Sequence, residues 1–306
     1  MQVKVYSDFE KKIWDEFVNN AKNSHFFFHR DFMEYHKDRF EDFSLMIYKN
    51  KKLVSILPAN KKDDLLYSHQ GLTYGGFLVK DSMKLSLMYE VIKAVKRFLK
   101  ENNIKEMIYK PSPYIYHQKP TFEDIYALNP QNIKRDISSV IDLTAPVKYS
   151  NGRKHSIRKA KEFGFEIKKS DDFKSFWLIL ESVLKTRHGS KPLHTLQEIE
   201  YLHSLFPNNI ELFLVQKDKK TFAGSVTFVT KQTVKLQYVA NFQEGRKLGA
   251  LDILIDFLLK NFYKDKRYFD FGTSLDSKGE LNLSLLDQKE RFGTGAVLNE
   301  TFRWKI

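Results

Sequence analysis

The sequence contains no cysteine, which excludes disulfide bonds, a thiolate nucleophile and any metal site built on cysteine. It also lacks an apolar run long enough to cross a bilayer. The N-terminus, MQVKVYSDFEKKIW, alternates apolar and polar residues and does not form a hydrophobic signal segment. These absences predict a soluble protein of the cytoplasm.

Several motifs of well-known enzyme classes are missing as well. The chain has no Walker phosphate loop, no zinc-protease helix, no Gly-X-Ser-X-Gly elbow and no Gly-X-Gly-X-X-Gly fingerprint. His188 and His194 are six residues apart without clustered carboxylates, so we expect no metal site.

The chain is strongly basic, with a formal net charge of +13. Such a charge attracts polyanions, including tRNA, a nucleotide-like cofactor or the anionic headgroups of a membrane surface. The basic residues are spread along the whole chain, so a solvated lysine-rich surface is the alternative interpretation. The segment RKHSIRKAK, residues 153–161, begins a helix and leaves the same alternatives open.

The predicted order of elements occurs twice. In the first half a hairpin is followed by a strand, a glycine-containing loop, a helix over 86–102 and a strand over 104–109. The second half repeats this order, with a helix over 250–262 and a strand over 267–272. We therefore predict an α/β (α+β) protein of two tandem domains, each a mixed, mostly antiparallel sheet flanked by helices. A Pro and an Asn-Gly near 145–151 divide the chain into domains 1–146 and 147–306.

The C-terminal segment is the richer of the two repeats in polar residues. Residues 267–304 predict a buried strand that ends at Gly272, a polar loop, an amphipathic helix over 282–292 and a final strand. Its counterpart after residue 108 is interrupted by prolines. We therefore place the chemistry in the second domain, with the first contributing to the wall of a cleft.

The order of strand, glycine-containing turn, helix and strand resembles the GNAT acyltransferase fold. The stretches SIRKAKEFGFEI, YFDFGTS and LLDQKERFG resemble the FemAB-like, peptidoglycan-bridge branch of that superfamily. The resemblance covers nearly the whole chain and implies transfer of an acyl or aminoacyl group to an amine, often an amino sugar or peptide amine of a cell-envelope precursor.

The donor implied by the resemblance is open to alternatives. The chain lacks the long charged helical hairpin that some tRNA-using members insert, which favours acyl-CoA, such as acetyl-CoA. Aminoacyl-tRNA is the alternative donor. From a different class, the alternative is a noncatalytic protein that binds polysaccharide or nucleic acid. Peripheral contact with an anionic membrane, and a monomer or a homodimer, are compatible with the same sequence.

A donor site is expected where the strand before residue 242 ends. Residues 243–250 predict a loop that opens a helix, so its N–H groups would bind a pyrophosphate. Arg246 to Gly249 match the first part of the GNAT phosphate pattern, whereas Leu251 departs from its last position. A helix start with glycine for close packing is the alternative. The expected cofactor-binding residues are Val239, Asn241, Arg246, Lys247, Gly249 and Ala250.

Three residues are candidates for catalysis. Tyr238 would protonate a leaving thiolate, since a phenol with a pKa of about 10 is a competent acid, or would be a core tyrosine. Asp270 would accept a proton from the attacking amine, or would hold the loop over 272–274 by hydrogen bonds. By family position Lys289 would face the acceptor or a donor phosphate; the alternative is a solvated helix lysine.

Further polar residues are expected to contact the substrate. The stretch TRHGSKPLH, residues 186–194, has the basic composition of an anion-binding loop or a lid. The other candidates lie in the polar loop and helix of the C-terminal segment. The expected substrate-binding residues are Arg187, His188, Lys191, Ser274, Asn282 and Gln288.

Overall fold

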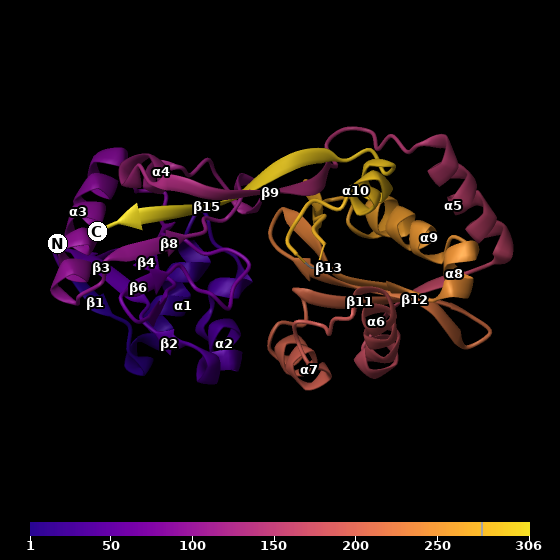
Figure 1. Ribbon diagram of the computed structural model, residues 1–306, viewed down its shortest axis with the longest axis horizontal. Helices are drawn as coiled ribbons and strands as arrows, with labels where there is room; N and C mark the ends of the chain where they lie inside the picture. The colour runs from indigo at the N-terminus through magenta and orange to yellow at the C-terminus, as the bar shows by residue number, and fades with distance from the viewer. Residues whose placement is uncertain (277) are drawn as a thin grey trace. The chain divides into compact units, whose positions relative to one another are not determined.

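The computed structural model describes residues 1–276 and 278–306, and for residues 187 and 188 it describes the backbone alone. The chain forms two compact units (Figure 1). Unit 1 comprises Met1–Asp136 and Leu298–Ile306, and unit 2 comprises Ile137–Val297. The last strand, β15 (Gly295–Lys305), pairs with β8 (Glu106–Tyr109) of unit 1, so the end of the chain belongs with the first unit. The division predicted at 146/147 had placed it with the second.

Unit 1 contains two groups of strands around one large helix. The first group is antiparallel and has the order β1 (Gln2–Val5), β3 (Leu45–Lys49), β4 (Lys52–Leu57), β7 (Leu78–Val79). The second has the order β15, β8, β6 (Leu65–Tyr67), β5 (Asn60–Lys62), β2 (Glu41–Asp42), with β6 and β8 parallel. Helix α3 (Leu85–Glu101) buries its apolar face, including Val91, Val95 and Leu99. The shorter helices are α1 (Lys11–Asn20), α2 (Arg30–Met33) and α4 (Glu123–Leu128).

Unit 2 is built on one mixed sheet with helices on both faces. The strand order is β10 (Glu166–Ser170), β11 (Ile210–Lys217), β12 (Lys220–Val229), β13 (Thr233–Asn241), β14 (Tyr268–Thr273), β9 (Gln131–Asp142). Among the described strand pairs of this unit, β13 and β14 are the ones that run parallel. Figure 1 shows α5 (Asn151–Phe163), α9 (Ala250–Phe257) and α10 (Leu283–Glu290) on one face, and α6 (Phe173–His188) and α7 (Leu196–Leu205) on the other.

Packing in unit 2 follows from side-chain size at the contacts. Helix α9 is apolar along most of its length and fills the space above the sheet with Ala250 and Leu254, both fully buried. Helix α5 lies on α9 through Ile157 and Ala160, and the small alanine permits a close approach. On the other face Phe176 of α6 lies so near Gly224 that a Cβ at this glycine would be 2.7 Å from the phenylalanine ring.

The predicted pair of α/β units is confirmed. Unit 2 has the predicted order of a hairpin, a further strand, a helix and a closing strand: β11, β12, β13, α9, β14. Unit 1 has the hairpin β3–β4, the helix α3 and the closing strand β8 in the same order, with three short strands, β5, β6 and β7, between the hairpin and the helix where the sequence predicted one. Both hairpins turn through two residues with positive φ, Asn50–Lys51 and Asp218–Lys219, which is the type I′ geometry that matches the twist of antiparallel strands. In the described part of the chain, no helix has the length and apolar character needed to span a membrane.

Candidate functional site

The parallel strands β13 and β14 stay paired over only three residues. Their last registered pair is Lys235 with Asp270. Further along β13, Gln237 is an extra residue in a β-bulge, because Leu236 and Tyr238 pair with consecutive residues of β12. The two strands part after Lys235 and Asp270, and a cavity of about 550 Å³ opens beside Leu236 and Phe271.

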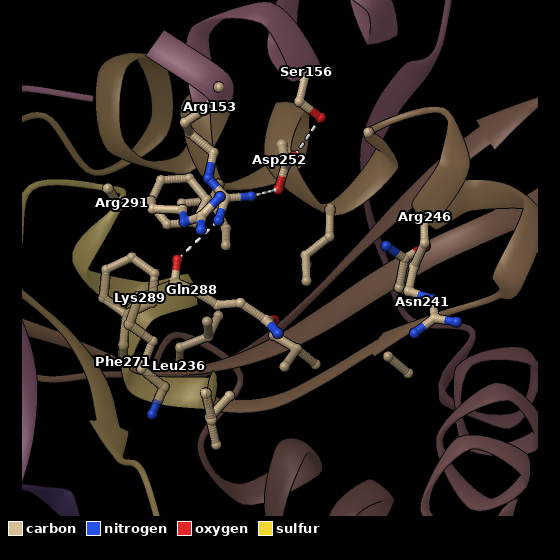
Figure 2. Close-up of a pocket in the computed structure, with 18 of the residues that line it drawn as sticks. Arg153, Ser156, Leu236, Asn241, Arg246, Asp252, Phe271, Gln288, Lys289 and Arg291 are labelled. Carbon is tan, nitrogen blue, oxygen red and sulfur yellow. Dashed lines mark hydrogen bonds and ion pairs between the residues drawn. The ribbon is translucent and has the colours of Figure 1, made fainter. Parts of the chain in front are cut away.

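The cavity lies entirely within unit 2. Its floor is β13, and its walls are the first turns of α5 and α9 and the segment formed by α10 and the residues after it (Figure 2). Basic side chains gather at both ends: Figure 2 shows Arg246 beside Asn241 at one end, and Arg153 and Arg291 at the other. The residues that carry the argument below are Arg153, Ser156, Asn241, Arg246, Gly249, Asp252, Gln288 and Lys289, all of which line the cavity.

Lys289 of α10 is held at the end of β14 by two backbone carbonyls. Its Nζ donates to the carbonyl oxygens of Gly272 (3.0 Å) and Thr273 (2.7 Å). Burial lowers the pKa of Lys289 to about 8, while the nearby Asp270 carboxylate acts in the opposite direction. An ammonium group has three N–H bonds. Among the described residues only these two carbonyls accept from it, so one N–H remains for a ligand.

Asp270 is buried next to the lining residue Phe271 and is not among the residues that line the cavity. Its side chain is 3% exposed, and its Oδ1 accepts the N–H of Gly272 at 2.7 Å. The carboxylate also raises the pKa of Lys235 and of Lys289, against the burial that lowers both. Of the two roles predicted for Asp270, this geometry favours holding the loop that follows β14.

Arg153 ties together the three helices that border the cavity. Its guanidinium donates to Asp252 of α9 through Nη1 and to the Gln288 carbonyl of α10 through Nη2, the latter at 2.8 Å. It also lies 4.1 Å from the centre of the Phe292 ring. Ser156 donates to the other oxygen of Asp252 at 2.5 Å (Figure 2). The Asp252 carboxylate is therefore occupied from two sides by α5.

The segment predicted to bind pyrophosphate has a different structure. Residues Gln243–Lys247 form the short helix α8. The N–H of Arg246 donates to the carbonyl of the N-cap residue Phe242 at 2.9 Å, and the N–H groups of Leu248 and Gly249 donate to carbonyls of α8 at 3.2 and 3.3 Å. The expectation of an open loop is thus corrected, because the helix uses these donors internally.

Helix α5 also covers the start of α9. Gly249 has a φ of 74°, and a Cβ at this position would lie 2.6 Å from the carbonyl oxygen of Ser156. Asp252, in the first turn of α9, supplies a negative charge at this helix N-terminus. A diphosphate at the start of α9 would therefore meet the backbone of α5, which already lies against Gly249, and the negative charge of Asp252.

The remaining predicted cofactor residues are divided between the cavity and its surroundings. Val239, Asn241, Arg246 and Gly249 line the cavity. Lys247 is exposed, and its carbonyl accepts from Lys159 at 2.9 Å, while Ala250 is fully buried in the core. In the described structure Arg246 has no ion-pair partner, so its guanidinium is available to an anion.

Tyr238 belongs to the opposite face of the sheet. Its hydroxyl lies 2.5 Å from Nδ1 of His194 and accepts the N–H of that residue at 3.2 Å, and its ring packs edge-on against Trp177. Tyr238 does not line the cavity. This arrangement favours the alternative of a core tyrosine.

Of the residues predicted to bind the substrate, only some lie at the cavity. Gln288 lines the cavity. Ser274 is fully buried, and Asn282 caps α10 by accepting the N–H of Leu285 at 3.0 Å. Lys191 is exposed in the loop after α6, and the side chains of Arg187 and His188 lie outside the described residues.

Sequence reasoning missed the residues that close the cavity. Arg153 was noted only as part of a basic helix, and Asp252, Leu236 and Phe271 were not singled out. The one available signal was Asp252, three residues after a glycine in the first turn of an apolar helix. No group of three histidine, aspartate or glutamate residues suited to a metal ion occurs among the described residues.

Comparison with known proteins gives the fold. No protein-family model matches the chain, and no curated protein matches it in sequence. The solved structure of FemX superposes with a TM-score of 0.70 at 12% identity, covering 100% of this chain and 98% of FemX. The C-terminal domain of a protein from Agrobacterium fabrum assigned as a lysylphosphatidylglycerol synthetase has a TM-score of 0.58 at 10% identity, covering 95% and 90%. L-PGS from Bacillus licheniformis gives 0.58 at 10%, covering 96% and 91%. The chain therefore has the same fold as FemX.

Proposed function

We propose that the protein is an N-acyltransferase that moves an aminoacyl group from the ester of an aminoacyl-tRNA to an amine of a cell-envelope precursor. The observation that carries this proposal is the parting of β13 and β14 into a cavity with the Lys289 ammonium at its edge. Separated strands leave backbone hydrogen-bonding groups that a carbonyl-containing donor can satisfy. The cavity is large enough for an aminoacyl ester.

The closed start of α9 argues for the choice of an ester donor. The internal hydrogen bonds of α8, the contact of Gly249 with Ser156 and the Asp252 carboxylate all disfavour a diphosphate at this position. Acyl-CoA carries a diphosphate, whereas the reactive end of aminoacyl-tRNA is a ribose ester. The geometry therefore favours the alternative donor over acyl-CoA, which the sequence had favoured. A similar structure from a protein named for lysylphosphatidylglycerol synthesis, an aminoacylation, supports this choice.

The proposed reaction is aminolysis of the donor ester. The amine nitrogen attacks the carbonyl carbon, a C–N bond forms, and the carbonyl oxygen takes the negative charge. The third N–H of Lys289 stabilises this oxyanion, because hydrogen bonds from a charged donor are stronger than those between neutral groups. Collapse breaks the C–O bond, and the ribose oxygen leaves with the proton that the amine loses. The products are an amide and a deacylated ribose hydroxyl.

The function is tested with a small nucleophile, since the acceptor is unidentified. Purified protein is incubated with a mixture of aminoacyl-tRNAs and hydroxylamine, and aminoacyl hydroxamates are measured by mass spectrometry. We expect hydroxamate formation above the rate without protein and its loss in Lys289→Met. The control is Lys278→Met, which makes the same substitution at an exposed lysine in the loop before α10.

A parallel reaction with acetyl-CoA decides between donors. Release of free thiol, with no hydroxamate from tRNA, would overturn the ester assignment in favour of acyl-CoA. Consumption of neither donor would overturn the transferase function and support a noncatalytic binding protein. Titration calorimetry with coenzyme A gives an independent answer, and we expect no binding at micromolar concentrations.

A further inference from the structure

A second, smaller hollow lies on α5 outside the cavity. Its volume is about 280 Å³, and it is lined by Tyr149, Lys154, Ile157, Arg158, Lys161, Asp256 and Lys260. Helix α5 presents Arg153 and Ser156 to the cavity and a different face to this hollow, at the spacing of residues 154, 158 and 161. The same helix thus connects the candidate active site to a second, strongly charged surface.

One buried carboxylate, Asp256, holds two of the basic side chains that line the hollow. Asp256 accepts from the Tyr149 hydroxyl at 3.0 Å and pairs with Lys260 at 2.5 Å and Lys161 at 3.5 Å. These contacts hold two lysines at the rim. Four basic side chains against one carboxylate leave the hollow with a formal charge of +3.

Two of the four cations are not neutralised by neighbours. Lys154 has no ion-pair partner in the part of the chain that the structure describes, and Arg158 has only Glu162, at 3.9 Å with both side chains 70% exposed. An exposed pair at that distance contributes little. The surface therefore carries positive charge that a polyanion can use.

We propose that this basic hollow, defined by Lys154, Arg158, Lys161 and Lys260, binds the phosphate backbone of the donor RNA while the aminoacyl end enters the cavity on the other face of α5. The proposal rests on the proposed function and deepens it. Lys154 and Arg158 contact phosphates directly, and Asp256 keeps the two remaining lysines in place.

The shape of α5 favours a nucleic acid over a membrane. Residues 154 and 161 are about 10 Å apart along a helix that rises 1.5 Å per residue. Nucleic acid carries a phosphate about every 3.4 Å along each strand, so this length spans about three phosphates. A helix that binds a membrane surface inserts apolar side chains. The apolar side chains of α5 are instead used inside the protein: Ile157 and Ala160 are buried, and Phe163 packs partly buried against the core.

Binding of a mixture of deacylated tRNAs tests the proposal without any reaction. The test variant is Lys154→Ala/Arg158→Ala/Lys161→Ala. The chain offers a matched control in Lys93→Ala/Arg97→Ala/Lys100→Ala, because these exposed residues of α3 have the same residue types and the same spacing. Both variants remove three positive charges from a helix surface. Dissociation constants are measured by filter binding from 50 to 300 mM salt, after thermal melting has verified folding.

We expect the test variant to bind tRNA at least about tenfold more weakly at 150 mM salt, with a salt dependence reduced by about two to three phosphate contacts. The control should bind within about twofold of the wild type. Equal losses in both variants would show a general charge effect and overturn the proposal, as would no loss in either. Loss of binding to phosphatidylglycerol vesicles with tRNA binding retained would assign the hollow to membranes instead. This experiment measures tRNA binding and not catalysis. It therefore tests the RNA site even if the hydroxamate assay detects no transfer.

Discussion

Lys235 and Asp270 form the last registered pair between β13 and β14, and the next residue of each strand, Leu236 and Phe271, lines the cavity. The Asp270 carboxylate thus lies where regular pairing ends and the candidate site begins. Asp270 accepts the N–H of Gly272. Burial lowers the pKa of Lys235 in the sheet and of Lys289 in α10, and the Asp270 carboxylate opposes this lowering at both lysines. A single buried charge therefore connects the fold to the proposed chemistry.

Asp270→Asn should shift the pH dependence of the reaction. The amide oxygen can still accept the Gly272 N–H, but the charge that raises the pKa of Lys289 is removed, so this pKa falls below about 8. If protonated Lys289 stabilises the oxyanion, the alkaline limb of the kcat–pH profile moves to lower pH, and activity persists on the acid side. Loss of activity at every pH, in a variant that still melts cooperatively, would instead indicate a general base.

Lys289→Met should abolish transfer and yet stabilise the fold near neutral pH. A lysine whose pKa is lowered from 10.5 to about 8 on folding makes folding less favourable wherever it is protonated in the unfolded chain. Replacing Lys289 by an apolar side chain of similar length should raise the free energy of unfolding by about 1 kcal/mol at pH 7. This value is smaller than the lowering of the pKa alone implies, because the Lys289 side chain is only partly buried.

The pH dependence provides the check on this effect. Between pH 8 and 10.5 the unfolded chain binds the proton that folded Lys289 has lost, so the stability of the wild type rises with pH in that window. The advantage of Lys289→Met should therefore shrink toward pH 10 in urea unfolding. A variant that is less stable than the wild type throughout would contradict the assigned pKa.

Tyr238→Phe separates a proton donor from a core tyrosine. The hydroxyl contacts His194 at 2.5 Å and lies outside the cavity, so its removal should cost about 1 kcal/mol of stability while kcat stays within about twofold. Urea unfolding and the hydroxamate assay measure the two quantities. A large fall in kcat with unchanged stability would return Tyr238 to the mechanism.

Local signals account for what the sequence predicted well. The hairpins follow from charged two-residue turns such as Asp218–Lys219, and α3 and α9 follow from apolar spacing along one stretch of chain. The start of α10 follows from Asn282, which caps its first turn. Each of these features depends on residues within one or two helical turns.

Contacts between distant segments explain what the sequence did not predict. Arg153 and Asp252 are 99 positions apart, and nothing in either local pattern indicates that α5 covers the start of α9. Residues 243–249 contain the glycines typical of a phosphate loop. In the fold, Gly245 is buried against Asn241 and Phe222, and Gly249 against Ser156, so these glycines serve close packing. The local pattern of residues 243–250 predicted a pyrophosphate site, whereas the packing of Gly249 against Ser156 depends on a contact that the sequence does not show.

Gly249→Ala tests that contact directly, and Gly164→Ala supplies a matched control. Both glycines adopt left-handed φ values, 74° and 82°, beside the ends of helices, so alanine costs about 1–2 kcal/mol of backbone strain at either site. At Gly164 the new methyl group meets only the Lys217 ammonium, at 3.9 Å, whereas at Gly249 it meets the Ser156 carbonyl at 2.6 Å. Overpacking should add about 1–3 kcal/mol at Gly249 alone. Equal losses in urea unfolding would show that α5 does not press on the start of α9, and would reopen that helix end to a diphosphate donor.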